Sequence, residues 1–363
     1  MEFIDLQTQY RHMRDPMNRA IQTVLDSSRY INGPQVKELE DALAQFVGCT
    51  HAVGCSSGTD ALLGILMALG VGPGDEVITT PFTFIATAET IALTKAKPVF
   101  VDVEPDTLNL DPTLIEAAIT PRTKGIMPVS IFGQCADYDA INTIAEQHGL
   151  WVVEDGCQSF GASYKGKRSC NLTLAAATSF FPAKPLGCYG DGGMTFTNDA
   201  QLAQQLKVIR EHGQIAQYQH ARLGINGRLD TLQAAILLAK LPFFADEITA
   251  RQQVAARYAE RLAGKVRIPT IRPENISVFA QYTVRVASRD QVRATLAAAG
   301  IPTAVHYPIP LHHQTVFADL NHSKEAFPHA TLAATEVISL PMHPYLTIEQ
   351  QDAVTEALLN ALP

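Results

Sequence analysis

Ser179-Phe-Phe-Pro-Ala-Lys184-Pro-Leu-Gly-Cys-Tyr-Gly-Asp-Gly-Gly193 joins an apolar segment to a glycine-rich turn and places one lysine between them. The flanking aromatic residues and prolines partly desolvate Lys184, which favours the neutral amine that attacks an aldehyde. An isolated loop lysine is ordinarily a solvated surface residue, because lysine is seldom buried. The interpretation of Lys184 as a Schiff-base lysine therefore depends on what other segments indicate.

The apolar run Val152-Val-Glu-Asp155 predicts a buried parallel strand that ends at Asp155. Ligands of open α/β sheets bind at the carboxyl ends of the strands. A carboxylate at this position can keep a pyridine nitrogen protonated, as in enzymes that use pyridoxal phosphate (PLP). The simpler alternative is that Asp155 only caps the next helix.

A strand end, a turn of small residues and a helix follow one another at Cys55-Ser-Ser-Gly-Thr-Asp60 and Ala61–Leu69. Free N–H groups and the positive dipole end make a helix amino-terminus a phosphate site, and Ser57 and Thr59 add hydroxyl donors. Such turns are more often plain N-caps. The order phosphate turn, acid, lysine is more informative than any one of the three segments.

With this order the chain resembles the fold-type I PLP enzymes, and more narrowly the sugar aminotransferases of the DegT/DnrJ/EryC1/StrS family. The motifs that carry the resemblance extend along nearly the whole chain: Phe3-Ile-Asp-Leu6, Asn32-Gly-Pro34, Ser57-Gly-Thr59, Thr83-Phe-Ile-Ala-Thr87, Glu154-Asp155, Lys184, Arg228-Leu-Asp230 and Val305-His-Tyr-Pro308. One departure is Gly156-Cys157, where such enzymes often have two alanines.

The resemblance implies a role for each matched residue. Lys184 would form the Schiff base and move the proton, and Asp155 would bind the pyridine nitrogen. The remaining implied cofactor residues are Gly58, Thr59 and Ser179 at the phosphate, Asn226 of a second subunit also at the phosphate, Gln158 at the ring 3-hydroxyl and Phe84 on the ring face. Without the family, core packing would explain Phe84 equally well. The contact from Asn226 implies a homodimer with shared active sites.

Three further segments resemble the aminotransferases of UDP-2-acetamido-2-deoxy-3-oxo-glucuronate: Gly133–Asp137, Gly161–Arg168 and His306–Pro310. This resemblance implies transfer of an amino group from L-glutamate to the 3-oxo sugar nucleotide, for bacterial surface polysaccharide such as O-antigen. The substrate carboxylate suits the planar guanidinium of Arg228, with His306 and Tyr307 as further candidates. In the alternative interpretation Arg228 forms a surface ion pair, and His306 and Tyr307 pack a proline-rich loop. A 4-oxo or 3-oxo deoxysugar nucleotide stays open as the substrate.

The composition fits a cytoplasmic metabolic enzyme of 363 residues, with 47% hydrophobic residues, 18% charged residues and a formal net charge of −8. An acidic chain without a run of basic residues predicts no nucleic-acid partner. No apolar stretch approaches the length of about 18 residues that spans a bilayer, and the amino-terminus lacks the regions of a signal peptide. The six cysteines have no metal-binding spacing and are expected to be reduced. No metal site is expected, and adjacent His312 and His313 are predicted to be solvent-exposed.

The first two-thirds of the chain alternate strand and helix, which predicts an α/β fold with a mostly parallel seven-stranded sheet between helices. The predicted strands are 51–56, 76–80, 98–103, 125–131, 150–154, 175–181 and 194–197. The predicted helices are 35–46, 60–69, 86–93, 112–118, 137–148, 199–212 and 231–261, the last broken near Pro242. Residues 1–245 are expected to form the large PLP-binding domain, and residues 246–363 a smaller α+β domain.

Three other classes of protein can be weighed against this interpretation. The first is a nicotinamide enzyme, whose dinucleotide-binding turn lies between a strand and a following helix. Gly70–Gly74 instead follows a helix, and Gly187–Gly193 precedes a strand, so neither glycine cluster fits this order. The sugar dehydratases of the family carry histidine at the Schiff-base position, where this chain has Lys184. A non-catalytic PLP-binding regulator is disfavoured because the chain has no basic DNA-binding module.

Overall fold

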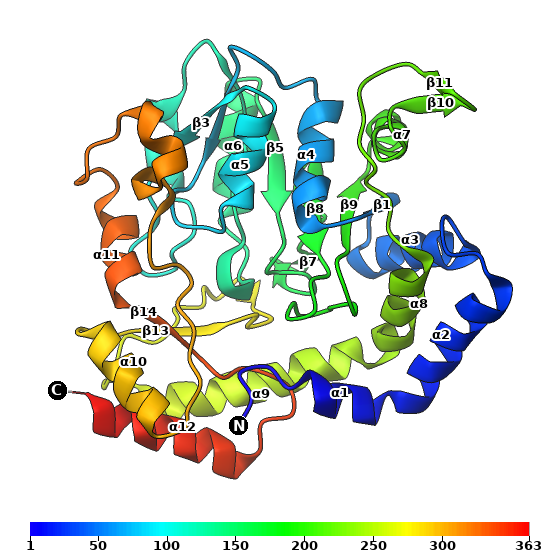
Figure 1. The fold of residues 1–363 in the computed structure, drawn as a ribbon. Coiled ribbons are helices and arrows are strands. Elements are labelled where there is room, and N and C mark those ends of the chain that lie inside the picture. Colours follow the sequence, from blue (N-terminus) through cyan, green and yellow to red (C-terminus); the bar gives the residue numbers. More distant parts are fainter. Residues whose placement is uncertain (363) are drawn as a thin grey trace.

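The computed structural model describes residues 1–362 and has a seven-stranded sheet at its centre (Figure 1). The strand order is β1-β9-β8-β5-β4-β2-β3, and β9 is the strand that runs antiparallel to its neighbours. The strands are β1 His51–Cys55, β2 Glu76–Thr79, β3 Lys97–Phe100, β4 Thr123–Ile126, β5 Trp151–Asp155, β8 Ala175–Ser179 and β9 Gly193–Thr197. The predicted seven strands and mostly parallel sheet are confirmed, with ends that differ by a few residues.

Consecutive apolar residues of the strands pack into two different cores, because successive side chains point to opposite faces of a sheet. Val152 belongs to one cluster and Val153 to the other. The first cluster is covered by α3 Pro34–Val47, α6 Tyr138–Gln147 and α8 Thr231–Lys240, and the second by α4 Gly58–Ala68, α5 Ala86–Leu93 and α7 Ala200–Ile209. Two helical layers therefore sandwich the sheet.

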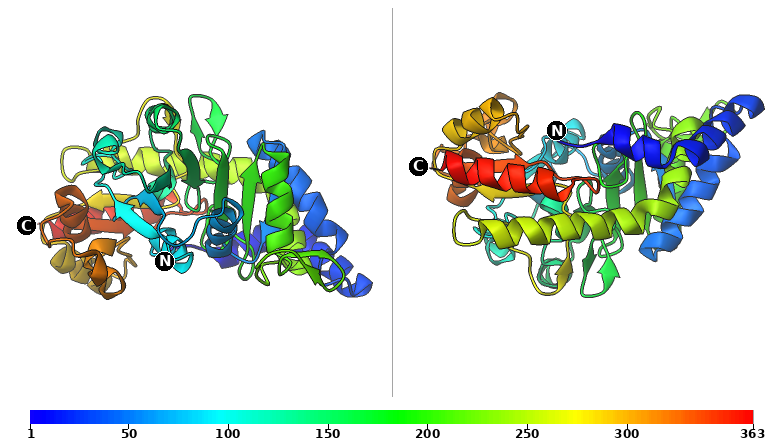
Figure 2. Two further views of the ribbon diagram at one scale, coloured as in Figure 1. Left: turned by 90° about the horizontal axis from the view of Figure 1, so that it is seen from above. Right: turned by 90° about the horizontal axis from the view of Figure 1, so that it is seen from below.

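A long helical segment leads from the sheet into the carboxyl-terminal part of the chain. It consists of α8, the 3-10 turn Leu241–Phe243 and α9 Phe244–Leu262, so the predicted break near Pro242 is confirmed. Two helices that the sequence analysis missed precede α3: α1 Leu6–His12, capped by Asp5, and α2 Arg14–Ser27. Seen from below, α1, α9 and the carboxyl-terminal helix lie next to one another (Figure 2).

The carboxyl-terminal part has a hydrophobic cluster of its own, which α9 shares with the elements that follow it. These elements are β13 Tyr282–Arg285, α10 Arg289–Ala298, β14 Val337–Leu340 and α12 Ile348–Ala361. The alanines of α11 Pro328–Glu336 belong instead to a separate cluster that includes Phe82 and Val129. A capping box at Thr347 starts α12. The expected domain boundary between residues 245 and 246 stays a prediction.

The structure corrects two predictions. Residues 112–118 form two 3-10 turns, Pro112–Leu114 and Glu116–Ala118, because their N–H groups bond the carbonyls three residues earlier, as Ile115 does to Pro112 and Ala118 does to Ile115. His312 is only 6% exposed, since its ring packs 4.9 Å from that of Phe327, whereas His313 is exposed as expected.

Several short strands were not predicted. They are β6 Ser163–Tyr164, β7 Lys167–Arg168 and β12 Asn275–Ile276 in one small sheet, and β10 Gln214–Ala216 and β11 Gln219–His220 in a hairpin. This hairpin projects from the body of the molecule beside α7 (Figure 1). None of the described helices is long and apolar enough to cross a membrane.

Candidate active site

A cavity of about 400 Å³ opens where the parallel strands end. β1 leads to its edge through Ser57, β5 ends there at Asp155, and β8 ends there at Ser179. The predicted residues that line it are Gly58, Thr59, Phe84, Asp155, Gln158, Ser179, Lys184 and Tyr307. The structure therefore gathers most of the predicted site around one space at the carboxyl edge of the sheet.

The amino-terminus of α4 forms one wall of this cavity. Ser57 caps the helix by accepting a hydrogen bond from the Asp60 N–H group at 3.0 Å. The N–H groups of Gly58 and Thr59 lie in the first turn, where a helix offers no carbonyl partner, so they are available to an anion. A Cβ atom at Gly58 would lie 2.7 Å from the Cβ atom of Ser179 and 2.8 Å from the Cys157 sulfur. The absence of a side chain at Gly58 therefore lets the wall close around a phosphate-sized group.

Asp155 is buried at the end of β5, with 4% of its surface exposed. Its Oδ2 atom accepts a hydrogen bond from Thr87 Oγ1 at 2.7 Å, and its Oδ1 atom accepts one from the Cys157 N–H group at 3.2 Å. Both carboxylate oxygens are thus held in place, and the carboxylate keeps acceptor capacity for a further donor in the cavity.

Lys184 lies in a tight loop between β8 and β9 rather than in a helix or strand. The backbone N–H of Lys184 donates to the Phe181 carbonyl at 2.8 Å, and that of Cys188 donates to the Phe180 carbonyl at 2.8 Å. These bonds fold the loop back on itself. Lys184 is therefore presented to the cavity from a closed turn.

Gln158 lies in a turn after β5. Its Nε2 atom donates to the Tyr307 hydroxyl at 3.1 Å, and its Oε1 atom accepts from the Phe132 N–H group at 2.9 Å. The ring of Tyr307 lies 6.2 Å from that of Phe84, which is 54% exposed. An exposed aromatic ring on a cavity wall can cover the face of a planar ligand.

Several titratable groups around the cavity are perturbed, including Cys157, whose pKa burial raises well above its ordinary value. Burial, with a smaller contribution from the charge of Lys184, lowers the pKa of His306 to about 4. Burial also raises the pKa of Tyr307 far above its ordinary value, with the neighbouring Asp155 charge adding to the shift. Glu154, buried behind Asp155, has a pKa raised by desolvation to about 7, although it accepts a hydrogen bond from Ser169. The His306 ring is therefore neutral at pH 7 and so is the Tyr307 hydroxyl.

Asn226, Arg228 and His306 are not among the residues that line the cavity. The Nη1 atom of Arg228 lies 3.4 Å from Glu211 Oε2, and Asn226 pairs with the backbone of Glu211. His306 lies beside the site, with its Nδ1 atom 2.9 Å from the Ser339 hydroxyl. Within one chain, the predicted substrate residues are thus only partly brought together.

The cavity is also lined by residues that the sequence offered no reason to place there: Leu62, Thr83, Ala86, Val129, Cys157 and Asp191. The structure also explains the departure at Gly156, since a Cβ atom there would lie 2.8 Å from the sulfur of buried Cys170. Thr87, which orients Asp155, follows Thr83 by four residues near the start of α5. The spacing of the two threonines can be seen in the sequence, but the hydrogen bond from Thr87 to Asp155 cannot.

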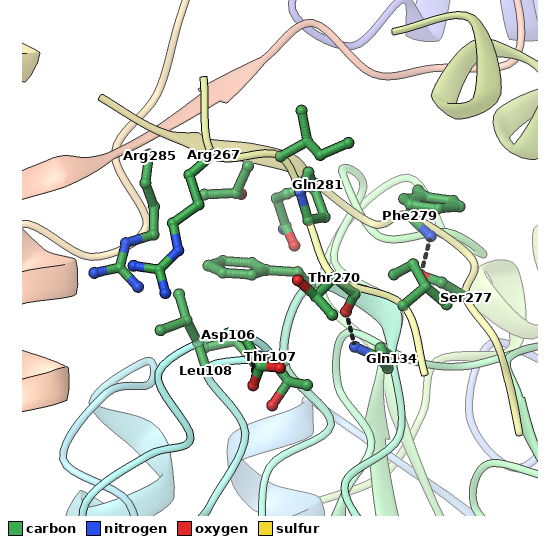
Figure 3. A pocket seen from close by; sticks show the side chains of 16 residues that line it. Asp106, Thr107, Leu108, Gln134, Arg267, Thr270, Ser277, Phe279, Gln281 and Arg285 are labelled. Atoms are coloured by element: carbon green, nitrogen blue, oxygen red, sulfur yellow. Dashed lines mark hydrogen bonds between the residues drawn. The ribbon is translucent and has the colours of Figure 1, made fainter. Parts of the chain in front are cut away.

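A second cavity lies between the loops after β3 and β4 and the segment of residues 267–285 (Figure 3). Arg267 and Arg285 lie at one end of it, and Arg285 is already paired with Glu336 at 2.7 Å. Its volume is about 30 Å³, which is room for about one or two water molecules. The larger cavity is therefore the candidate active site.

Comparison with known proteins agrees with this geometry. A model of the DegT/DnrJ/EryC1/StrS aminotransferase family matches residues 12–359. The chain is 59% identical over 361 residues to the UDP-2-acetamido-2-deoxy-3-oxo-D-glucuronate aminotransferase of Pseudomonas aeruginosa, covering 99% of this chain and 100% of that protein.

Two solved structures are similar over nearly the whole chain. One is S. venezuelae DesV in complex with a ketimine intermediate, with a TM-score of 0.97, 41% identity and coverage of 99% of this chain and 97% of that one. The other is NtdA from Bacillus subtilis with bound cofactor PMP, with a TM-score of 0.91, 30% identity and coverage of 99% and 83%.

Proposed function

Because the chain belongs to the DegT/DnrJ/EryC1/StrS aminotransferase family, we propose that it transfers an amino group from L-glutamate to UDP-2-acetamido-2-deoxy-3-oxo-glucuronate. The amino group would enter at the 3-oxo carbon, and the product would be UDP-2-acetamido-3-amino-2,3-dideoxy-glucuronate. Such an amino sugar serves bacterial surface polysaccharide, including O-antigen. The observation that carries the choice of substrate is the full-length similarity to the Pseudomonas aeruginosa enzyme.

The cofactor of this reaction is PLP, and the cavity has the chemical groups that PLP requires. The first turn of α4 offers N–H donors to the phosphate, buried Asp155 can face the pyridine nitrogen, and Lys184 supplies an amine. When bound, PLP supplies the aldehyde that carries the amino group and the electron sink that makes the substrate carbon acidic.

The protein's own side chains then have distinct tasks. Asp155 keeps the pyridine nitrogen protonated, and Thr87 holds the carboxylate in its orientation. The Lys184 amine binds the cofactor and, once released, takes and returns the proton at the reacting carbon. Phe84, beside Tyr307, covers the face of the pyridine ring and excludes water. Gln158, held by its hydrogen bond to the Tyr307 hydroxyl, reaches the 3-hydroxyl of the pyridine ring.

On the substrate side, neutral His306 and Tyr307 suit hydroxyl or amide groups of the sugar. Arg228 then supplies the positive charge for the uronate carboxylate. A 4-oxo deoxysugar without a carboxylate would make Arg228 dispensable, so this residue also distinguishes the main alternative substrate class.

We infer a homodimer in the cytoplasm. The exposed apolar side chains in and next to the β10–β11 hairpin support an association, because Tyr218 is 83% exposed and Leu223 is 87% exposed. A second copy that covered this hairpin could bring Asn226 and Arg228 to the cavity of its partner. The cytoplasmic location agrees with the six free cysteines and with the sugar-nucleotide substrate.

The test is a visible spectrum of the purified protein with PLP, followed by additions. L-Glutamate should bleach the band of lysine-linked PLP, and the 3-oxo uronate sugar nucleotide, generated in situ, should restore it. Restoration by a 4-oxo deoxysugar nucleotide instead would replace the substrate. No lysine-linked band at all would overturn the assignment of Lys184 and of the cofactor.

A further inference from the structure

The last residue of α8, Lys240, is a lysine with 1% of its surface exposed. Its Nζ atom donates to the Gly187 carbonyl at 2.7 Å and to Gln9 Oε1 at 2.7 Å, and it lies 4.3 Å from the centre of the Tyr189 ring. Burying an ammonium group is costly unless it is hydrogen-bonded or paired. These three contacts are therefore what allows a charge at this position.

The Gly187 carbonyl belongs to the loop that carries Lys184, three residues earlier. A Cβ atom at Gly187 would lie 2.4 Å from the Pro182 carbonyl oxygen, so the loop is packed against itself at this point. α8 also holds the end of the loop, because Gln233 Oε1 accepts from the Tyr189 N–H group at 2.9 Å. One helix thus fixes the loop at two neighbouring backbone positions.

On its other side, Lys240 is connected through Gln9 to α1, to the start of α9 and to the segment before α12. Gln9 of α1 donates through Nε2 to Glu247 Oε1 of α9 at 2.9 Å. The same carboxylate oxygen accepts a hydrogen bond from the Tyr345 hydroxyl at 2.6 Å. Gln9 and Glu247 are buried, so this connection is shielded from solvent. It runs from the loop of Lys184 through the amino-terminal helix to the carboxyl-terminal segment before α12.

We propose that Lys240 is a positioning residue for Lys184, and that it fixes the loop by anchoring the Gly187 carbonyl to Gln9 and Glu247. The inference rests on the proposed function, since Lys184 matters only as the reacting amine. Reacting groups must be held within about 0.5 Å of their productive geometry, and a misplacement of about 1 Å can cost about 100-fold in rate. Burial lowers the pKa of Lys240 to about 8, partly offset by the Glu247 charge, so the ammonium persists at neutral pH.

The test compares Lys240→Met, which keeps an unbranched side chain one atom shorter and removes the charge, with Arg261→Met. Arg261 on α9 bonds Thr355 and pairs with Asp352 at 3.1 Å, far from the loop network, so it controls for general loss of stability. Hydrogen exchange of the peptide spanning residues 180–190 is measured in the cofactor-free protein. The rate at which added PLP gives its lysine-linked absorbance, and kcat and KM, are measured with the cofactor.

In Lys240→Met, exchange in the loop should be about tenfold faster or more, because local opening costs less. Formation of the lysine-linked band should slow, and kcat should fall about 10- to 100-fold with the sugar KM within about twofold. Arg261→Met should change none of these readouts. A folded Lys240→Met protein with wild-type loop exchange and wild-type band formation would overturn the inference.

If Lys240→Met does not fold, Gln9→Met decides the question. It leaves the Lys240 bond to Gly187 and breaks the connection to Glu247, so loop exchange should rise by a smaller factor. Unchanged loop exchange in a folded Gln9→Met protein would then overturn the inference. The exchange measurement uses no cofactor, so a wild-type protein that forms no band with PLP would refute the proposed function separately.

Discussion

The Lys184 loop and the segment of residues 211–228 are both expected to serve one active site, yet they are built differently. The Lys184 loop is closed by backbone hydrogen bonds and anchored by buried Lys240. The other segment includes a hairpin with exposed apolar residues, and its Arg228 is paired with Glu211 at 3.4 Å. The difference agrees with the proposed homodimer, in which one chain supplies most residues around the cofactor, here called the cofactor half. A second copy would supply Arg228 of the substrate half and the phosphate contact from Asn226.

The largest effect should come from Lys184→Ala, which removes the only amine among the residues that line the cavity in the described chain. We expect a loss of turnover of about 10⁴-fold or more, the upper end for removing a general acid–base group. PLP should still bind through the phosphate wall and Asp155. Its spectrum should lack the lysine-linked band, and retention of that band would show that another amine holds the cofactor.

Asp155→Asn tests the cofactor half by changing charge rather than reactivity. Losing a charge-assisted hydrogen bond to the pyridine nitrogen should cost about 1.5–3 kcal/mol, or roughly 10- to 150-fold in kcat. Thr87→Val is the matched variant, because it removes the 2.7 Å hydrogen bond to Asp155 and leaves the charge. The decrease in kcat of Thr87→Val should be smaller, equivalent to about 0.5–1.5 kcal/mol. Equal losses in both half-reactions are expected, and a loss in the sugar half alone would contradict this role.

A mixing experiment tests whether the substrate half comes from the partner. Arg228→Ala alone should weaken binding of the uronate sugar by about 1.5–3 kcal/mol and spare the glutamate half-reaction. Mixed with Lys184→Ala, it should form hybrid dimers in which one site has both wild-type residues, restoring about a quarter of the sites after random exchange. If Arg228 acts within its own chain, mixing restores nothing, because no hybrid site is then complete.

The sequence predicts well which residues of the cofactor half gather around the cavity, because its signals are local. An apolar run that ends in Asp155, and a small-residue turn before a helix, each place a side chain at the sheet edge without long-range information. The network around Lys240 could not be predicted, since Lys240 and Gln9 are separated by 231 positions. No local pattern distinguishes Lys240 from an ordinary lysine at the end of a helix. The burial of His312 was missed for the same reason, as it depends on Phe327 from a later segment.

The smallest predicted effect concerns His306, which lies between the two halves. Its pKa of about 4 is below the ordinary value, owing to burial and the nearby Lys184 charge, so the ring is neutral above about pH 5. The unfolded chain takes up a proton near pH 6.5, so the stability that the neutral ring provides is present above that pH and is lost as the pH falls toward 4. In the wild type the melting temperature should therefore fall more between pH 6.5 and 5 than in His306→Phe.

The same variant should weaken sugar binding by only about 0.5–1.5 kcal/mol, as expected for loss of a neutral hydrogen bond. Between pH 5.5 and 8, the KM for the sugar should depend on pH in the same way in the wild type and in His306→Phe. A KM that rises through pH 6.5 in the wild type, and not in the variant, would mean that the charged ring binds the carboxylate. Arg228 would then share that task with a residue of the cavity's own chain, and the division between the two halves would be less sharp.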